Sequence, residues 1–118
     1  MYTSIARWYV KEGKLEEVTK ALVALAEQVH ENECDTWGYL VHSGGDGSVP
    51  PSSANEIVFV EIYKDEAALG KHISGPAFQD FLKKSSDLFV SIPGGTSPFF
   101  QAQHLDRIAG FVRSEASG

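Results

Sequence analysis

The stretch EIVFVEIY, residues 56–63, limits the possible folds more than any other part of the chain. Its β-branched and aromatic residues predict a strand. Because side chains of a strand alternate between the two faces of a sheet, one face receives Val58, Val60 and Ile62, and the other receives Ile57, Phe59, Glu61 and Tyr63. Both sets are largely apolar. A sheet that contains this strand therefore needs a cover on each face.

The remaining residues predict further strands and helices around this segment. The strands are expected at about residues 3–11, 36–42 and 99–105, and the helices along 15–29, along 65–72 and through the segment that carries Phe78, Phe81 and Leu82. Apolar residues three and four positions apart indicate the first helix. Asp65 is a suitable N-cap for the second helix, and the Ser-Gly-Pro run at 74–76 ends it.

This order, β-α-β-β-α-β, is that of the ferredoxin-like unit, an α+β fold with an antiparallel sheet and both helices on one face. The second face of the sheet is then apolar but bare, which implies a partner subunit, and we predict a homodimer. We expect Glu61 on this second face. A partly buried carboxylate there needs a partner, for which Arg7, His72 and a helix end are candidates, and without one its pKa is raised.

Two segments outside the predicted elements are rich in small and polar residues. SGGDGSVPPSSAN, residues 43–55, predicts a long loop that either closes over a ligand or covers a neighbouring subunit. The last residues, 106–118, form a predicted C-terminal tail, of which the final RSEASG is small and polar. The length of 118 residues fits one domain, which we place at residues 3–105.

Composition excludes several classes of function. The formal net charge of −6 argues against nucleic acid and anionic membranes as partners, since both select clustered Lys and Arg. No apolar run reaches the roughly 20 residues that cross a bilayer, and MYTSIARWYV is unlike a signal peptide. Cys34 is the single cysteine, so an internal disulfide is excluded. We expect a cytoplasmic protein.

One longer motif resembles a known family. EIYKDEAALGKHISGPAF, residues 61–78, is similar to the Glu-x-Trp/Tyr-x-Asp-x-x-Ala-Leu-x-x-His pattern of the antibiotic biosynthesis monooxygenase family. ARWYVKEGKLEEV and ENECDTWGYLVH stand where that family has its first strand with the start of the helix and its second strand. The resemblance covers residues 3–105 and implies a dimeric α+β barrel, in which two four-stranded sheets face each other.

The resemblance also implies a chemistry. Family members of known activity include quinol monooxygenases and enzymes that oxidise anthrones to quinones, and they use O2 without flavin, haem or metal. Such a reaction requires that a phenol or quinol lose a proton, because the anion can then pass an electron to oxygen. We therefore predict a cofactor-independent monooxygenase that takes a small aromatic molecule and O2, with a long middle loop like that of the quinol-oxidising members.

His72 matches the histidine of the family and is the first candidate for proton transfer, with Tyr63 and Glu61 as polar support. The structural alternatives are a helix-end histidine paired with Glu61, a salt bridge for Glu61, and a tyrosine packed at the dimer seam. Five aromatic residues are candidates for binding the substrate: Trp37, Tyr39, Phe59, Phe78 and Phe81. Such residues are more often part of the core.

Other functions remain open at this point. The same fold serves as a non-catalytic ligand-binding or stress-response module, or as a polyketide cyclase or isomerase. A pocket too small or too polar for a bicyclic ring favours the binding module, and independence from oxygen favours the cyclase. A metal site is not expected, because His42, His72 and His104 have no ligand-like spacing.

Overall fold

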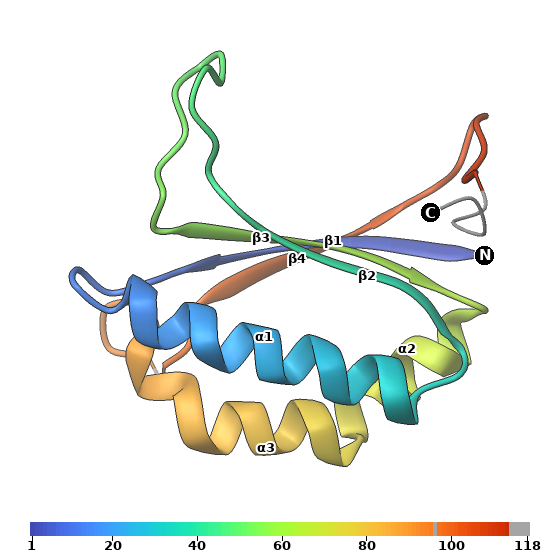
Figure 1. Cartoon of the computed structure of the whole chain (residues 1–118), viewed down its shortest axis with the longest axis horizontal. Coiled ribbons are helices and arrows are strands. Elements are labelled where there is room, and N and C mark those ends of the chain that lie inside the picture. The colour runs from blue at the N-terminus through green and yellow to red at the C-terminus, as the bar shows by residue number, and fades with distance from the viewer. Residues whose placement is uncertain (96, 114–118) are drawn as a thin grey trace.

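A computed structural model describes residues 1–95 and 97–113 (Figure 1). The elements follow in the order β1 (Tyr2–Tyr9), α1 (Leu15–Asn32), β2 (Thr36–Ser43), β3 (Glu56–Tyr63), α2 (Glu66–Ser74), α3 (Pro76–Ser85), a 3-10 turn (Ser86–Leu88) and β4 (Phe100–Leu105). The strands form one antiparallel sheet in the order β2-β3-β1-β4. The ferredoxin-like α+β prediction is confirmed, with the second helical segment divided into α2 and α3 where the sequence breaks.

Local chemistry explains where these two helices begin. The side chain of Asp65 accepts a hydrogen bond from the backbone N–H of Ala68 at 2.9 Å, which caps α2. α3 starts with Pro76 in its first turn, where a missing N–H costs nothing. Gly75 lies between the helices, and a Cβ there would stand 2.8 Å from the carbonyl oxygen of Lys71. Only glycine allows the chain to turn this closely.

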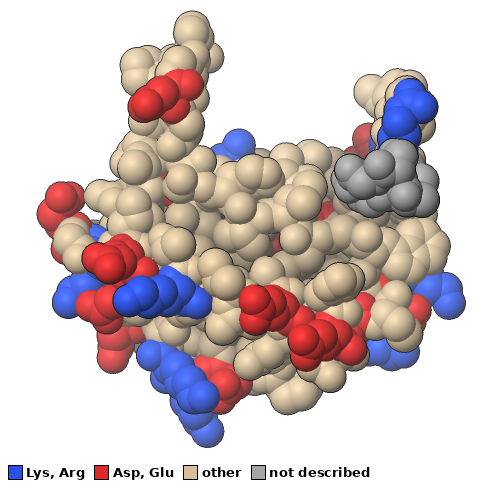
Figure 2. All heavy atoms as spheres, in the orientation of Figure 1, with Lys and Arg blue, Asp and Glu red and all other residues tan. Residues whose placement is uncertain are grey.

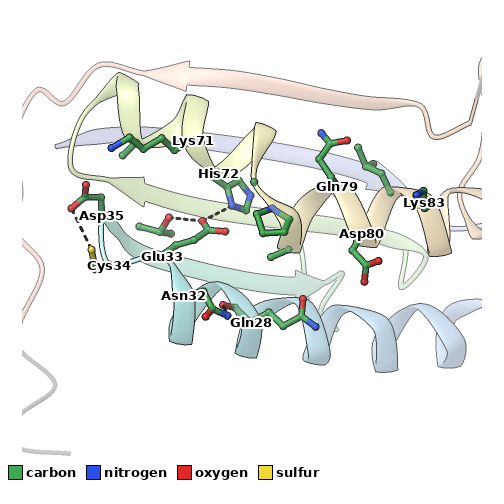
Figure 3. A pocket seen from close by; sticks show the side chains of 16 residues that line it. Gln28, Asn32, Glu33, Cys34, Asp35, Lys71, His72, Gln79, Asp80 and Lys83 are labelled. Atoms are coloured by element: carbon green, nitrogen blue, oxygen red, sulfur yellow. Dashed lines mark hydrogen bonds and ion pairs between the residues drawn. The ribbon is translucent and has the colours of Figure 1, made fainter.

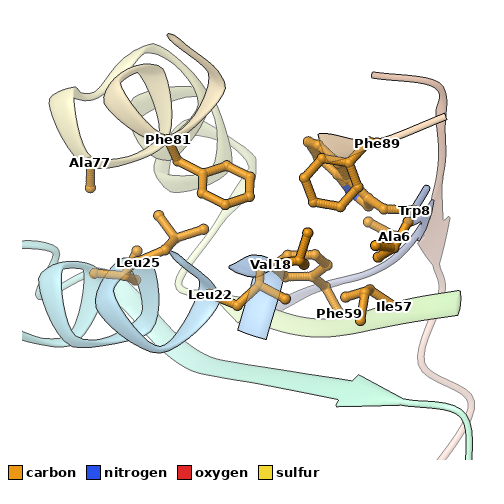
Figure 4. Packing of buried hydrophobic residues seen from close by; sticks show 12 residues of the cluster. Ala6, Trp8, Val18, Leu22, Leu25, Ile57, Phe59, Ala77, Phe81 and Phe89 are labelled. Carbon is orange, nitrogen blue, oxygen red and sulfur yellow. The ribbon is translucent and has the colours of Figure 1, made fainter. Parts of the chain in front are cut away.

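The core lies between the helices and one face of the sheet (Figure 4). α1 contributes an apolar face at the predicted spacing, made of Val18, Leu22, Leu25 and Val29. From the sheet and α3, aromatic rings fill the middle, and the largest cluster surrounds Trp8, whose ring lies 5.0 to 6.1 Å from those of Phe59, Phe78, Phe81 and Phe89. The aromatic packing fixes the helices against the sheet.

Among residues 1–95 and 97–113, no helix covers the opposite face of the sheet. Figure 1 shows all three helices on one side and the 44–55 arm projecting on the other, as does the tail at 106–113. Val58, Val60 and Ile62 lie together on this bare face and are half-buried. Figure 2 shows charged side chains gathered around the helices, while the surface between arm and tail is mostly uncharged. The tail residues 114–118 lie outside the described part of the chain.

The expected side of Glu61 is wrong. Glu61 is buried on the helix-covered face, together with Ile57, Phe59 and Tyr63. The alternation is as predicted, but both sets of residues are apolar enough to be covered, so the pattern could not tell which set meets the helices. Arg7, which was one of the expected partners of Glu61, instead forms an ion pair with Glu56 at 3.4 Å.

β2 contains one irregularity that matters for the site. Thr36 pairs with Tyr63 and Gly38 pairs with Ile62, so Trp37 is an extra residue in the strand. This bulge places Tyr39 opposite Glu61, on the helix-covered face. Simple alternation would place Trp37 and Tyr39 on the same face, but Trp37 is the unpaired residue of the bulge and is 55% exposed. In the described residues no helix has the length and hydropathy of a membrane span.

Candidate functional site

A small cavity of about 120 Å³ lies between the sheet and α2, and we call it the inner cavity. Its lining residues come from all four strands, from α2 and from α3: Ser4, Ala6, Trp8, Tyr39, Phe59, Glu61, Leu69, His72, Ile73, Phe78, Phe100 and Ala102. The strand register orders them along its floor. Ser4 is paired with Glu61 at one end, Ala6 with Phe59 and Ala102 in the middle, and Trp8 with Phe100 at the other end.

The register therefore gives the inner cavity a polar end and an apolar end. At the apolar end the rings of Trp8 and Phe100 stack, with centroids 4.6 Å apart and planes 10° from parallel. At the polar end the hydroxyl of Tyr63 donates a hydrogen bond to Glu61. The hydroxyl of Tyr39 is buried and has no hydrogen-bond partner among the described residues.

Burial determines the protonation of this polar end. Burial raises the pKa of the Glu61 carboxyl, although the hydrogen bond from Tyr63 and the nearby His72 oppose that rise. Burial and the charges of Glu61 and Glu33 raise the pKa values of Tyr39 and Tyr63, so both hydroxyls keep their protons at neutral pH. The polar end holds two hydroxyl donors beside a carboxyl that binds a proton more readily than usual.

His72 connects the inner cavity to an open groove on the outside of the helices. This outer groove, of about 1040 Å³, lies between the C-terminal end of α1, α2 and α3, and most of its polar lining is exposed (Figure 3). His72 is 3% exposed and lines both spaces. Its Nδ1 lies 2.7 Å from a carboxylate oxygen of Glu33, which also accepts a hydrogen bond from the Thr36 hydroxyl at 2.9 Å. Figure 3 shows the imidazole directed at Glu33.

The match with known proteins settles the family. A family model described as antibiotic biosynthesis monooxygenase matches residues 1–84. The chain belongs to the antibiotic biosynthesis monooxygenase family. None of the curated proteins matches the sequence. The family resemblance stated from the motif at 61–78 is thus confirmed.

Solved structures agree with this family. A protein from Nitrosomonas europaea, provisionally named an antibiotic biosynthesis monooxygenase, is 16% identical with a TM-score of 0.75, and the match covers 92% of this chain and 100% of that one. One of the same provisional name from Bacteroides thetaiotaomicron is 18% identical with a TM-score of 0.76 over 97% and 95% of the two chains. A third, from Caulobacter crescentus, is 18% identical with a TM-score of 0.72 over 92% and 90%. At such identities the likeness shows the fold, which is the α+β barrel fold of the family.

Within this family fold, the structure brings most of the predicted site residues together. His72, Glu61 and Tyr63 are neighbours, with ring centroids of Tyr63 and His72 5.7 Å apart. Tyr39, Phe59 and Phe78 line the inner cavity as well. Two predicted substrate-binding residues do not line it: Phe81 is buried in the core behind Phe78, and Trp37 is exposed on the bulge.

Glu33 was not predicted as a site residue. It contacts His72 from a position 39 residues earlier in the chain, and no local pattern in the sequence marks that contact. The other candidate histidines lie elsewhere, since His42 faces the carbonyl of Val58 and His104 faces that of Thr3. Across residues 1–95 and 97–113, no group of three or more His, Cys, Asp and Glu side chains could hold a metal ion.

Proposed function

We propose that the protein is a cofactor-independent monooxygenase that oxidises a quinol or a similar electron-rich aromatic with O2. The observation that carries the proposal is the position of His72, which lines an aromatic-walled cavity and contacts a carboxylate on its other side. A quinol that reacts with one O2 gives a hydroxyquinone and one water. The substrate supplies all four electrons, so the protein has to handle protons and exclude water.

The hydrogen bond to Glu33 selects the form of His72 that such a reaction needs. When Nδ1–H donates to the Glu33 carboxylate, Nε2 carries no proton and is the basic nitrogen. Nε2 takes the proton of the quinol hydroxyl, and the carboxylate of Glu33 stabilises the imidazolium that forms. Thr36 holds the same carboxylate oxygen in place. Glu33 lies at the outer groove, so the proton has a route to solvent that does not cross the cavity.

The aromatic walls supply the second requirement. Trp8, Phe59, Phe78 and Phe100 surround the apolar end of the inner cavity. Their faces stack on an aromatic ring and keep water away from the reactive anion. Tyr39 retains its hydroxyl proton and is available as a donor to a substrate oxygen that becomes negative, while the hydroxyl of Tyr63 donates to Glu61.

Oxygen consumption tests this function directly. Metal-chelated protein is mixed with a quinol, and the autoxidation rate is subtracted. We expect enzyme-dependent uptake that falls about 10²-fold or more in His72→Ala, the usual contribution of a positioned base. Glu33→Gln should lower the rate, while Glu31→Gln, an exposed glutamate near the same helix end, should not. Uptake that is unchanged in folded His72→Ala removes His72 from the mechanism. Conversion of the ligand without oxygen uptake points to a cyclase or isomerase.

We also propose that a second copy of the chain covers the bare sheet face, so that the working form is a homodimer. Val58, Val60 and Ile62 form an apolar strip there, and Leu40 beside it is exposed. The arm and the tail that flank this face carry fully exposed apolar side chains, with Val49 96% and Ile108 100% exposed. The exposure of these apolar side chains to water is unfavourable, and a partner subunit that docks between the arm and the tail would bury them.

Sedimentation tests the dimer. Val60→Asp should produce a monomer, because a charge would be buried in the interface. Val23→Asp, the same change on the outer surface of α1, should leave the dimer intact. A monomeric parent protein at micromolar concentration would contradict the proposal.

A second candidate function is a non-catalytic ligand-binding module. The observation in its favour is the size of the inner cavity, about 120 Å³, which is small for a bicyclic ring. Stoichiometric ligand binding without oxygen uptake or ligand conversion, over a panel of quinols, would favour this module over the monooxygenase.

A further inference from the structure

We propose that the inner cavity is built for a single aromatic ring that carries a hydroxyl group, and that it rejects fused rings. This inference rests on the proposed function for the location of the site, and it narrows the substrate to monocyclic phenols and quinols. Three features carry it: the volume of the cavity, the residues that create the space, and the hydroxyl that stands unpartnered at one end.

The volume is that of one ring. An engineered apolar protein cavity of about 150 Å³ holds benzene, and pockets for larger ligands measure about 300–1,000 Å³. The inner cavity, at about 120 Å³, therefore accepts one six-membered ring after small side-chain shifts and has no room for two or three fused rings. The outer groove is larger, but it is open to solvent and charged side chains such as Lys71, Asp80 and Lys83 stand around it, so it encloses a single ring less well than the inner cavity does.

The space exists because two neighbouring floor positions carry only a methyl group. Ala6 and Ala102 are paired across β1 and β4, and the next pair along each strand is Trp8 with Phe100. The stacked rings of Trp8 and Phe100 form a wall at the end of this floor. A longer ligand would have to displace that stack, because Trp8 is also in contact with Phe59 and Phe89 in the core. The length of the cavity is thus set by packing that extends into the core.

The hydroxyl preference comes from Tyr39. Its buried hydroxyl has no hydrogen-bond partner in the part of the chain that the structure describes, and an unsatisfied buried donor is unfavourable until an acceptor takes its hydrogen bond. A phenolic oxygen accepts a hydrogen bond from Tyr39 and presents its own proton to Glu61 or His72, which line the same end. A ring without oxygen would leave Tyr39 unpartnered.

An entrance for a small ring lies at the edge strand. Phe100 is 43% exposed on β4, and Ile73 is 47% exposed on α2, so the cavity reaches the surface between these two elements. Ala102 lines the cavity and is itself exposed, so that a larger side chain at this position can fill the space without disturbing the buried core.

The test is a binding experiment that does not depend on turnover. Phenol, toluene and 2-naphthol are titrated into 15N-labelled protein, and amide shifts of residues around the cavity, such as Leu69 and Ile73, locate the site. We expect phenol to bind at least tenfold more tightly than 2-naphthol and to bind more tightly than toluene. Tyr39→Phe should weaken phenol about tenfold and leave toluene unchanged. Ala102→Leu should abolish binding of both, while Ala67→Leu, the same change on the exposed surface of α2, should not.

Each result separates this inference from the proposed function. Phenol binding at the cavity without oxygen uptake by any monocyclic quinol supports the ligand class and removes the monooxygenase. Equal affinity for 2-naphthol and phenol, or no binding of either, overturns the ligand class. Turnover of a fused-ring quinol in the absence of phenol binding would overturn it too, while supporting the monooxygenase.

Discussion

Tyr39 and Tyr63 stand on either side of Glu61, but only one of their hydroxyls has a hydrogen-bond partner. Tyr63 donates to the Glu61 carboxyl, whereas the hydroxyl of Tyr39 is buried without a partner among the described residues. Replacing each tyrosine by phenylalanine removes one oxygen and keeps the ring. The two replacements should change the free energy of unfolding in opposite directions, because one removes a bond and the other removes an unpaired polar group.

The magnitudes follow from these two environments. An unsatisfied buried donor costs about 1–3 kcal/mol, so Tyr39→Phe should stabilise the free protein by about 1 kcal/mol or more. A hydrogen bond to a charged or partly charged group contributes about 1.5–3 kcal/mol, so Tyr63→Phe should destabilise it by about 2 kcal/mol. The free energies of unfolding of the two variants should therefore differ by about 3 kcal/mol. For a domain of this size that gap corresponds to a difference of roughly 10 °C in Tm.

Urea unfolding followed by circular dichroism measures both variants, at one protein concentration because dimerisation would add to apparent stability. Equal m-values for the two variants would show that the unfolded states are comparable. A loss of stability in Tyr39→Phe similar to that in Tyr63→Phe would refute the reasoning. It would mean that the Tyr39 hydroxyl is hydrogen-bonded in the free protein, for example to an ordered water.

Two further predictions concern pH and helix capping. Because burial raises the pKa of Glu61 in the folded protein, its contribution to stability is complete below the ordinary carboxyl pKa and is lost as pH rises through the folded pKa. Glu61→Gln should therefore match the parent in urea unfolding at pH 4 and exceed it at pH 7, and a constant difference would contradict this. Asp65→Ala should cost about 1 kcal/mol by removing the cap on Ala68, and Asp65→Asn, which keeps an acceptor oxygen, should cost less in the same assay; equal losses would exclude the cap as the cause.

The sequence was sufficient for most of the fold. The β-branched run at 56–63 predicts β3 with its observed bounds, and the helical spacing of Val18, Leu22, Leu25 and Val29 predicts the buried face of α1. These are local signals, since each depends on residues a few positions apart. The break between α2 and α3 at Gly75 is of the same kind.

The site was only partly predictable, because it depends on contacts between distant elements. The motif around His72 indicated the corner at which the inner cavity lies, but the contact of the His72 Nδ1 with Glu33 spans 39 residues and has no local pattern. The face of Glu61 could not be assigned, because both faces of β3 are apolar. The exposed position of Trp37 could not be predicted, because a bulge interrupts the alternation of β2 and a bulge is decided by pairing with the neighbouring strand.

The bulge at Trp37 has a consequence for how this site can change during evolution. If Trp37 were paired in regular alternation after Thr36, Gly38 would stand opposite Glu61 and Tyr39 would move to the bare face of the sheet. Because the bulge takes up one residue, deletion of Trp37 would make the pairing regular and leave Tyr39 opposite Glu61, with its buried hydroxyl still in the inner cavity. Chains with this fold can therefore lose the extra residue of β2 and keep the polar ligand contact, provided that the strand pairs in the same register on both sides of the bulge.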